Sequence, residues 1–180
     1  MAIPVIKPPR EEVLKCIARF KDLKGTSDGL PDMGVDGYHR TFYSVLGFDQ
    51  PVGDAQFSPF GDAVKPKVGH LQTGFGLAFV KCKPGQGVFM HVHDTYETFM
   101  VMDGQWKLEW EGDQGVETVL LEPLDFIAFP IGVQRRFECA QAPAGKEEGT
   151  LLGIIAGDHP AAEYSPEAVK ALAAHGITVQ

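Results

Sequence analysis

Two histidines and a glutamate stand close together near the middle of the chain, at positions 91, 93 and 97. The intervals between them are even, so on an extended chain the side chains of His91, His93 and Glu97 point to one face. Two imidazoles and a carboxylate suit a divalent ion such as Fe(II), Mn(II), Ni(II) or Zn(II), and leave coordination positions open for substrate or water. The spacing therefore predicts one divalent metal ion bound by these three residues.

Glycines at fixed distances flank the three predicted ligands. Gly85 lies before His91 and Gly104 lies after Glu97, which gives the segment the form G-x5-H-x-H-x3-E-x6-G. This segment resembles the first motif of the cupin superfamily at every fixed position. The resemblance covers about residues 70–156 and is to the small single-domain, metal-binding monocupins. It implies an all-β fold, a double-stranded β-helix (the cupin or jelly-roll barrel), with a metal ion inside.

The second cupin motif, G-x5-P-x-G-x2-H-x3-N, is only partly present. Pro130 and Gly132 match it, but Arg135 stands where the motif has its fourth metal ligand, a histidine. Arginine does not ligate a cation, because it stays protonated and offers only hydrogen-bond donors. Two interpretations of Arg135 stay open. Either it is a catalytic residue that binds a carboxylate or another anionic group of a substrate, or it forms a salt bridge with Glu97 in a degenerate metal site.

A three-ligand centre leaves up to three octahedral positions, enough for a chelating substrate and O₂ together. We therefore favour a mononuclear, Fe(II)-dependent non-haem dioxygenase that acts on a small anionic organic molecule. Phe89, Phe99 and Trp106 are expected to form an apolar wall that excludes bulk water. Two alternatives remain: a metal-dependent lyase or isomerase without redox chemistry, and a non-catalytic cupin that binds a small molecule. The resemblance by itself indicates a site and not a reaction.

Composition and charge narrow the range of partners. The net charge of −8 argues against nucleic acid, because an acidic chain repels a phosphate backbone. No apolar run approaches the roughly 18 residues of a membrane helix. Tandem prolines at positions 8 and 9 argue against a signal peptide, and three widely spaced cysteines predict buried free thiols in a reducing cytoplasm. The expected partner is a small-molecule substrate, and the resemblance to small cupins also implies a homodimer.

Short β-type runs separated by glycine and proline turns follow one another from residue 70 onward, as in a sandwich or small barrel. They predict strands at 71–82, 87–91, 97–102, 105–110, 116–121, 126–129, 135–139 and 150–156. The run 126–129 is apolar on both faces, which indicates burial against another layer. These strands would form a cupin barrel over residues 70–156.

The segments on either side of the barrel are predicted to belong to the same domain. Residues 1–69 form an N-terminal extension, with a helix at 10–24 from apolar residues at helical spacing, a loop at 25–37, a strand at 38–46 and a long excursion at 47–69. Residues 157–180 form a C-terminal tail, with a helix at 166–175 that Ser165 caps and Pro166 begins.

Three further residues are weaker candidates for the site. His70 begins the strand before the first motif and would reach the pocket if that strand lines it. Tyr96 has the opposite parity to the predicted ligands, and Tyr43 lies on the early strand. Either tyrosine would serve as a general acid only if the strands twist it toward the metal.

Overall fold

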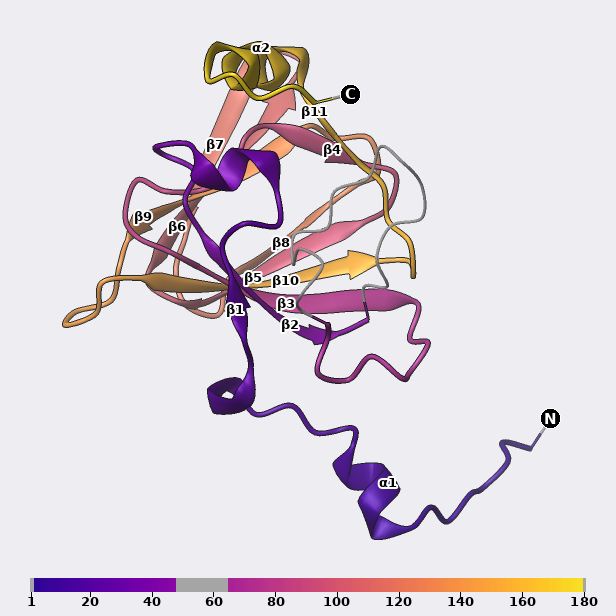
Figure 1. The fold of residues 1–180 in the computed structure, drawn as a ribbon. Coiled ribbons are helices and arrows are strands. Elements are labelled where there is room, and N and C mark those ends of the chain that lie inside the picture. Colours follow the sequence, from indigo (N-terminus) through magenta and orange to yellow (C-terminus); the bar gives the residue numbers. More distant parts are fainter. Residues whose placement is uncertain (1, 48–64, 180) are drawn as a thin grey trace.

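A computed structural model of the chain describes residues 2–47 and 65–179. These residues form two antiparallel sheets that face each other, with short helices at the two ends of the chain (Figure 1). The all-β fold class predicted from the sequence is therefore confirmed. Among the described residues no helix is long and apolar enough to cross a membrane.

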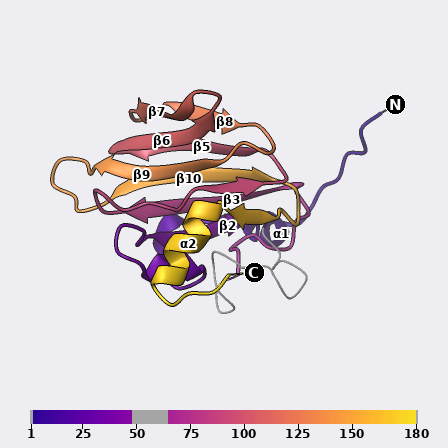
Figure 2. The same cartoon turned by 90° about the horizontal axis from the view of Figure 1, so that it is seen from above.

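Sheet A contains six strands. Their spatial order is β1 (Gly25–Thr26), β2 (Thr41–Leu46), β3 (Phe75–Cys82), β10 (Gly149–Ala156), β5 (Glu97–Asp103) and β8 (Phe126–Phe129). Sheet B contains five strands, in the order β11 (Ala162–Tyr164), β4 (His91–His93), β9 (Arg135–Gln141), β6 (Gln105–Gly112) and β7 (Gly115–Leu121). In Figure 2, where the molecule is seen from above, the strands of each sheet lie side by side, from β7 and β8 at one edge of the picture toward β2 at the other.

The core between the sheets follows from strict alternation along the strands. In β6, Trp106 and Leu108 are fully buried, whereas Lys107 and Glu109 lie on the opposite face. The Trp106 indole N–H donates to the backbone carbonyl of Asp103 over 3.0 Å, so burial leaves its one donor satisfied. Phe99, Val101, Phe129, Phe137 and Leu151 complete this core from the other strands.

The helix predicted at 10–24 is wrong in length. The helix α1 covers only Arg10–Leu14 and has no buried residue, and a short 3-10 helix follows at Phe20–Asp22. Among the apolar residues at helical spacing, Val13, Leu14 and Ile17 are exposed in the described part of the chain. A helix of this size is marginal in water without tertiary packing, so the pattern did not produce a long helix.

Four other details differ from the sequence prediction. The predicted loop 25–37 contains β1 and a 3-10 helix, Pro31–Gly34, and the strand predicted at 87–91 lies instead at His91–His93. The strand β11 was not predicted, because three residues carry almost no periodicity. Phe126 in β8 is 67% exposed, so no layer formed by the described residues covers it. Most of the excursion predicted at 47–69 lies outside the described residues.

The ends of the chain agree better with the prediction. The helix α2 spans Pro166–Ala174, and the Ser165 hydroxyl accepts a hydrogen bond from the Ala168 N–H, as a capping serine should.

All three cysteines are free thiols. Cys82 and Cys139 are buried as expected, whereas Cys16 is exposed.

A buried ion pair connects the N-terminal segment and the C-terminal strand β11 to the barrel. Asp32 and Arg40 have no exposed side-chain surface, and Arg40 Nη2 lies 2.7 Å from Asp32 Oδ1. The same carboxylate accepts the hydroxyl of Tyr164, from β11, over 2.9 Å and the backbone N–H of Phe89, just before β4, over 3.4 Å. One carboxylate therefore connects the N-terminal segment, the C-terminal strand and the approach to β4.

Replacement of Asp32 by asparagine should destabilise the fold strongly. Asp32→Asn leaves the buried guanidinium of Arg40 without its counter-charge, and removal of one partner of a buried pair costs about 3–5 kcal/mol. Urea denaturation would measure the free energy of unfolding. The control is Asp36→Asn, which changes a fully exposed carboxylate close by and should shift stability by less than about 0.5 kcal/mol. Equal stabilities of the two variants would contradict the importance of the pair.

Candidate metal centre

The three predicted ligands come together between the two sheets. His91 and His93 lie on β4 of sheet B, and Glu97 is the first residue of β5 in sheet A. Their ligand atoms all lie within 4.8 Å of one another. The Nε2 atoms of His91 and His93 are 3.8 and 3.6 Å from the Glu97 carboxylate. The sequence argument placed them on one face of one extended strand, but they meet because the chain crosses from sheet B to sheet A between positions 93 and 97.

Backbone carbonyls fix the orientation of both imidazole rings. His91 Nδ1 lies 2.8 Å from the carbonyl oxygen of Phe89, and His93 Nδ1 lies 2.8 Å from that of Ala161. A carbonyl oxygen only accepts, so in each ring Nδ1 carries the proton and donates it. The lone pair of each Nε2 is then directed toward Glu97. This is the outer hydrogen bonding that prepares histidines as metal ligands.

The two orienting carbonyls are themselves held in place. The N–H of Phe89 donates to buried Asp32, and the N–H of Ala161 donates to Asp94 Oδ1 over 2.8 Å. The strand β11 pairs with β4 so that Tyr164 is opposite His91 and Ala162 is opposite His93. Sequence reasoning missed Asp32, Ala161 and Asp94. A backbone carbonyl leaves no signal in residue type, and Asp32 lies 59 positions away from His91.

The charge state of the cluster suits a cation. Burial lowers the pKa of His93 to about 4, although neighbouring Glu97 opposes the shift. Burial alone would raise the pKa of Glu97, but the charges of His93, His91 and Arg135 outweigh it and hold this pKa at about 2. At neutral pH the cluster therefore offers the neutral imidazole of His93 and an ionised carboxylate. Ligands in these states bind a metal without first releasing protons.

Arg135 joins the cluster from β9, the strand beside β4 in sheet B. It begins β9, pairs with His91 across the sheet and is completely buried. Its Nε donates to Glu97 Oε2 over 2.9 Å and its Nη1 donates to the Val133 carbonyl over 2.8 Å. The salt bridge to Glu97, one of the two interpretations, is thus present. The remaining nitrogen, Nη2, is buried and has no hydrogen-bond partner within 2–47 and 65–179.

The three residues expected to form an apolar wall belong to two different clusters. Phe99 and Trp106 lie in the core between the sheets. Phe89 instead stacks on Tyr38, with ring centroids 3.5 Å apart, in a separate cluster that includes Leu172 of α2. The backbone at Phe89 is oriented so that its carbonyl accepts the hydrogen bond from His91 Nδ1, while its ring points to the other cluster. The contribution of Phe89 to the site is therefore a backbone contact.

None of the three weaker candidates reaches the cluster. His70 Nε2 lies 3.7 Å from the thiol of Cys16 in the N-terminal segment and does not belong to the cluster. Tyr43 packs against Phe20 on the outer face of sheet A, with ring centroids 5.0 Å apart. Tyr96 is 58% exposed. No general acid among these residues is in place beside the predicted metal.

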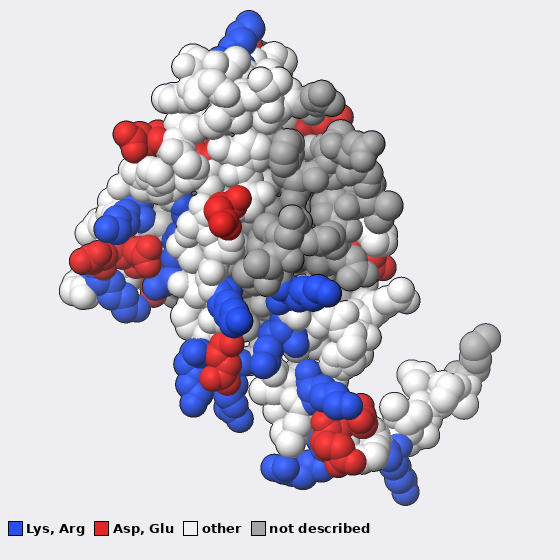
Figure 3. Space-filling model, in the orientation of Figure 1, with Lys and Arg blue, Asp and Glu red and all other residues white. Residues whose placement is uncertain are grey.

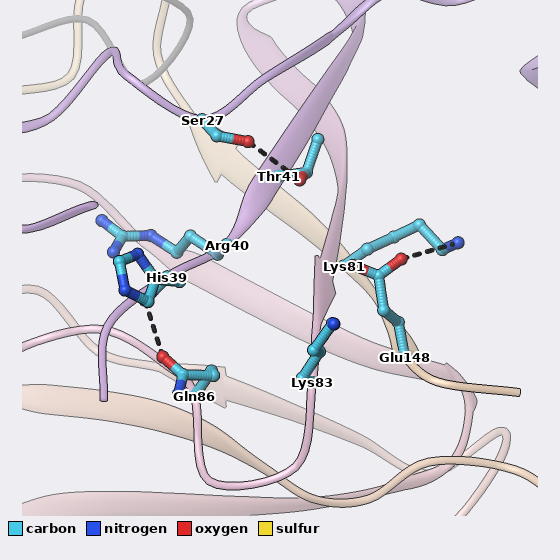
Figure 4. Close-up of a pocket in the computed structure, with 8 residues that line it drawn as sticks. All are labelled: Ser27, His39, Arg40, Thr41, Lys81, Lys83, Gln86 and Glu148. Carbon is cyan, nitrogen blue, oxygen red and sulfur yellow. Dashed lines mark hydrogen bonds and ion pairs between the residues drawn. The ribbon is translucent and has the colours of Figure 1, made fainter. Parts of the chain in front are cut away.

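A separate pocket of about 320 Å³ opens where β2 begins and β3 ends (Figure 4). Lys81 and Glu148 form an ion pair across it at 3.2 Å. The other lining residues are Ser27, His39, Arg40, Thr41, Lys83 and Gln86. None of the metal-centre residues lines this pocket, so the chemistry of the cluster is not located there.

Comparison with protein-family models and with curated proteins finds no match for this chain. Solved structures do match. An oxalate oxidase is 16% identical with a TM-score of 0.56, over 93% of this chain and 75% of that one. An oxalate decarboxylase from Lactobacillus farciminis, in a formate complex, is 14% identical with a TM-score of 0.53, over 84% and 36%. A vicilin from hazelnut (Corylus avellana) is 13% identical with a TM-score of 0.52, over 82% and 35%.

These neighbours share one fold. The chain has the cupin fold. The predicted jelly-roll barrel is thereby confirmed, and the first cupin motif, residues 85–104, contains β4 and β5, where the candidate ligands lie. At this level of identity the likeness establishes the cupin fold and not an activity. The chain also spans about half or less of the length of several similar structures, 48% of one oxalate oxidase and 36% of the decarboxylase.

Metal analysis tests the predicted ligands directly. Protein purified without chelators and offered Fe(II), Mn(II), Ni(II) or Zn(II) should hold about one equivalent, measured by plasma mass spectrometry. His93→Ala should hold less than about a tenth of an equivalent, because it removes one of three donors.

The matched control is His175→Ala, which changes an exposed histidine at the end of α2 and should bind metal like the wild type. Wild-type protein that binds less than about a tenth of an equivalent of every ion would contradict the metal centre.

Proposed function

We propose that this chain is a metal-dependent enzyme, a mononuclear non-haem dioxygenase that uses Fe(II) and acts on a small anionic organic molecule. In this proposal His91, His93 and Glu97 hold the metal and Arg135 binds the substrate. The observation that supports it best is the buried Nη2 of Arg135, unpartnered within the described chain, beside the carboxylate of the candidate ligand Glu97.

The unused nitrogen favours an anionic substrate. A buried donor without a partner costs about 1–3 kcal/mol, which an acceptor on a bound molecule would recover. Nε already donates to Glu97, so Nη2 can receive an anion while the salt bridge persists. A divalent ion together with Arg135 outweighs the single negative charge of Glu97. The resulting positive centre, away from bulk water, attracts a carboxylate more strongly than an exposed arginine would.

The donor set fits Fe(II). Two imidazoles whose Nε2 atoms are free, together with one carboxylate, form the combination associated with non-haem iron oxygenases. When bound, Fe(II) would supply the one-electron chemistry that lets O₂ react with an organic molecule, and both oxygen atoms would enter the product. The chain itself orients the ligands through Phe89 and Ala161, positions the anion through Arg135 and limits water through the core around Phe99.

Two of the similar proteins are compatible with this class of substrate. An oxalate oxidase and an oxalate decarboxylase share the cupin fold, and oxalate is a small dicarboxylate. Vicilin shares the same fold as well. The fold by itself therefore does not favour a small anionic substrate. Arg135 supplies the argument for an anion, and the reaction has to be tested directly.

Oxygen dependence distinguishes the dioxygenase from the alternatives. The Fe(II)-loaded protein should consume O₂ when offered a member of a panel of small mono- and dicarboxylic acids that includes oxalate and glycolate. With ¹⁸O₂, both labelled atoms should enter the product. Equal turnover in anaerobic buffer would overturn the dioxygenase and indicate a lyase or isomerase. Binding of a panel acid without turnover in either atmosphere would indicate a non-catalytic binder.

Arg135→Met tests the substrate-binding residue. With the panel acid that is turned over fastest, kcat/KM should fall by about 10- to 100-fold, the loss expected for one charged hydrogen bond. Metal content should stay near one equivalent, because Arg135 is not a ligand.

Arg136→Met is the matched control. The neighbouring Arg136 is partly exposed and pairs with Glu109 on the outer face of sheet B, so its loss should change kcat/KM by less than about twofold. If Arg135→Met behaves like Arg136→Met, Arg135 does not bind the substrate.

A further inference from the structure

A partly exposed tryptophan stands where the core between the sheets ends, beside the candidate metal centre. Along β6, Trp106 and Leu108 are fully buried, and Trp110 follows them on the same inward face with part of its surface exposed. In β5 of the facing sheet Phe99 is buried, whereas Glu97, on the same face and two residues earlier, is partly exposed. Solvent therefore reaches the space between the sheets at the level of Trp110 and Glu97.

Three strands of sheet B carry one row of inward side chains at this level. The register pairs Trp110 of β6 with Arg135 of β9, and Arg135 with His91 of β4. Side chains directly opposite each other in an antiparallel pair have Cβ atoms about 4.5–5.5 Å apart. Arg135 therefore has the candidate ligand His91 as its neighbour on one side and Trp110 as its neighbour on the other.

Two aromatic rings lie beside the guanidinium of Arg135. The ring centroid of Phe129 is 6.0 Å from Arg135 Cζ and 6.4 Å from the ring centroid of Trp110. Phe129 is opposite Glu97 in sheet A and is only 3% exposed. Trp110 is the ring of this pair that keeps exposed surface, so it is the one that a bound molecule would contact.

The charge of Arg135 is set apart from the charges at the surface. On the face seen in Figure 3, Lys and Arg side chains gather in groups that also contain Asp or Glu side chains. The side chain of Arg135 has no exposed surface, and its Nη2 has no hydrogen-bond partner within residues 2–47 and 65–179. A carboxylate bound there would form a charged hydrogen bond from which water is excluded, and exclusion of water strengthens such a bond.

We propose that Trp110 is a specificity-determining residue, and that the substrate is a planar conjugated carboxylate, such as an aromatic acid, whose ring lies against the Trp110 indole. This proposal rests on the proposed function, because it takes Arg135 as the residue that binds the carboxylate. In an aromatic acid the ring begins one bond away from the carboxylate carbon, so it extends to the neighbouring side chain in the row. Two aromatic rings in contact gain free energy beyond the area that they bury, which a saturated ring does not.

Ligand binding in anaerobic buffer tests the proposal without turnover. Protein supplied with Fe(II) should bind benzoate about three- to tenfold more tightly than cyclohexanecarboxylate, which has the same charge and number of carbon atoms but no planar ring. Trp110→Ala should reduce this ratio of dissociation constants to about one. Isothermal titration calorimetry measures both constants, and circular dichroism checks that the variant is folded.

Tryptophan fluorescence gives a second readout from more conservative variants. The chain contains two tryptophans, and Trp106 is fully buried. Benzoate should change the emission of Trp106→Phe, in which Trp110 is the remaining tryptophan. In the matched variant Trp110→Phe, in which Trp106 remains, benzoate should leave the emission unchanged.

Three results would overturn the proposal: equal affinity for the two acids, no binding of benzoate at about 10 mM, or the same emission change in both phenylalanine variants. Failure of the proposed function gives a different pattern. If no acid is oxidised but benzoate is preferred and Trp110 reports its binding, the dioxygenase is wrong and the aromatic-acid site stands. Oxygen uptake with an aliphatic acid and no preference for benzoate would uphold the dioxygenase and overturn the role of Trp110.

Discussion

Two hydrogen bonds, from His91 Nδ1 and His93 Nδ1 to backbone carbonyls, set the chemistry of the centre. Without them each imidazole could rotate or change tautomer, and Nε2 would not be held toward Glu97. The carbonyls belong to residues outside the strands that carry the ligands. For that reason the position of the backbone at Phe89 and Ala161 is as important to the proposed metal centre as the histidines themselves.

That backbone is held by parts of the chain distant in sequence. Asp32, from the N-terminal segment, binds the Phe89 N–H and the Tyr164 hydroxyl, and its charge is balanced by buried Arg40. The strand β11, from the C-terminal segment, pairs with β4 beside both histidines. The first and last segments therefore contribute strands to the two sheets and support the site between them. We propose that the residues before 70 and after 156 form a single domain with the barrel.

The sequence identified the residues that form the candidate centre and only some of what positions them. The spacing of His91, His93 and Glu97 predicted a cluster, and alternation in β6 predicted a buried Trp106, because both signals are local. The crossing between sheets, the carbonyl of Ala161 and the role of Asp32 depend on contacts between distant segments. The apolar pattern at 10–24 was misread because amphipathic spacing predicts a helix only where another surface covers it.

The most direct test of the account is a crystal structure of the Fe(II)-loaded protein, with anomalous diffraction measured at the iron edge. The account predicts a single anomalous peak about 2.0–2.3 Å from the Nε2 atoms of His91 and His93 and from one oxygen of Glu97. Both Nδ1 atoms should remain bonded to the carbonyls of Phe89 and Ala161, and Arg135 should remain outside the coordination sphere. A peak elsewhere, or iron bound through Nδ1, would contradict it.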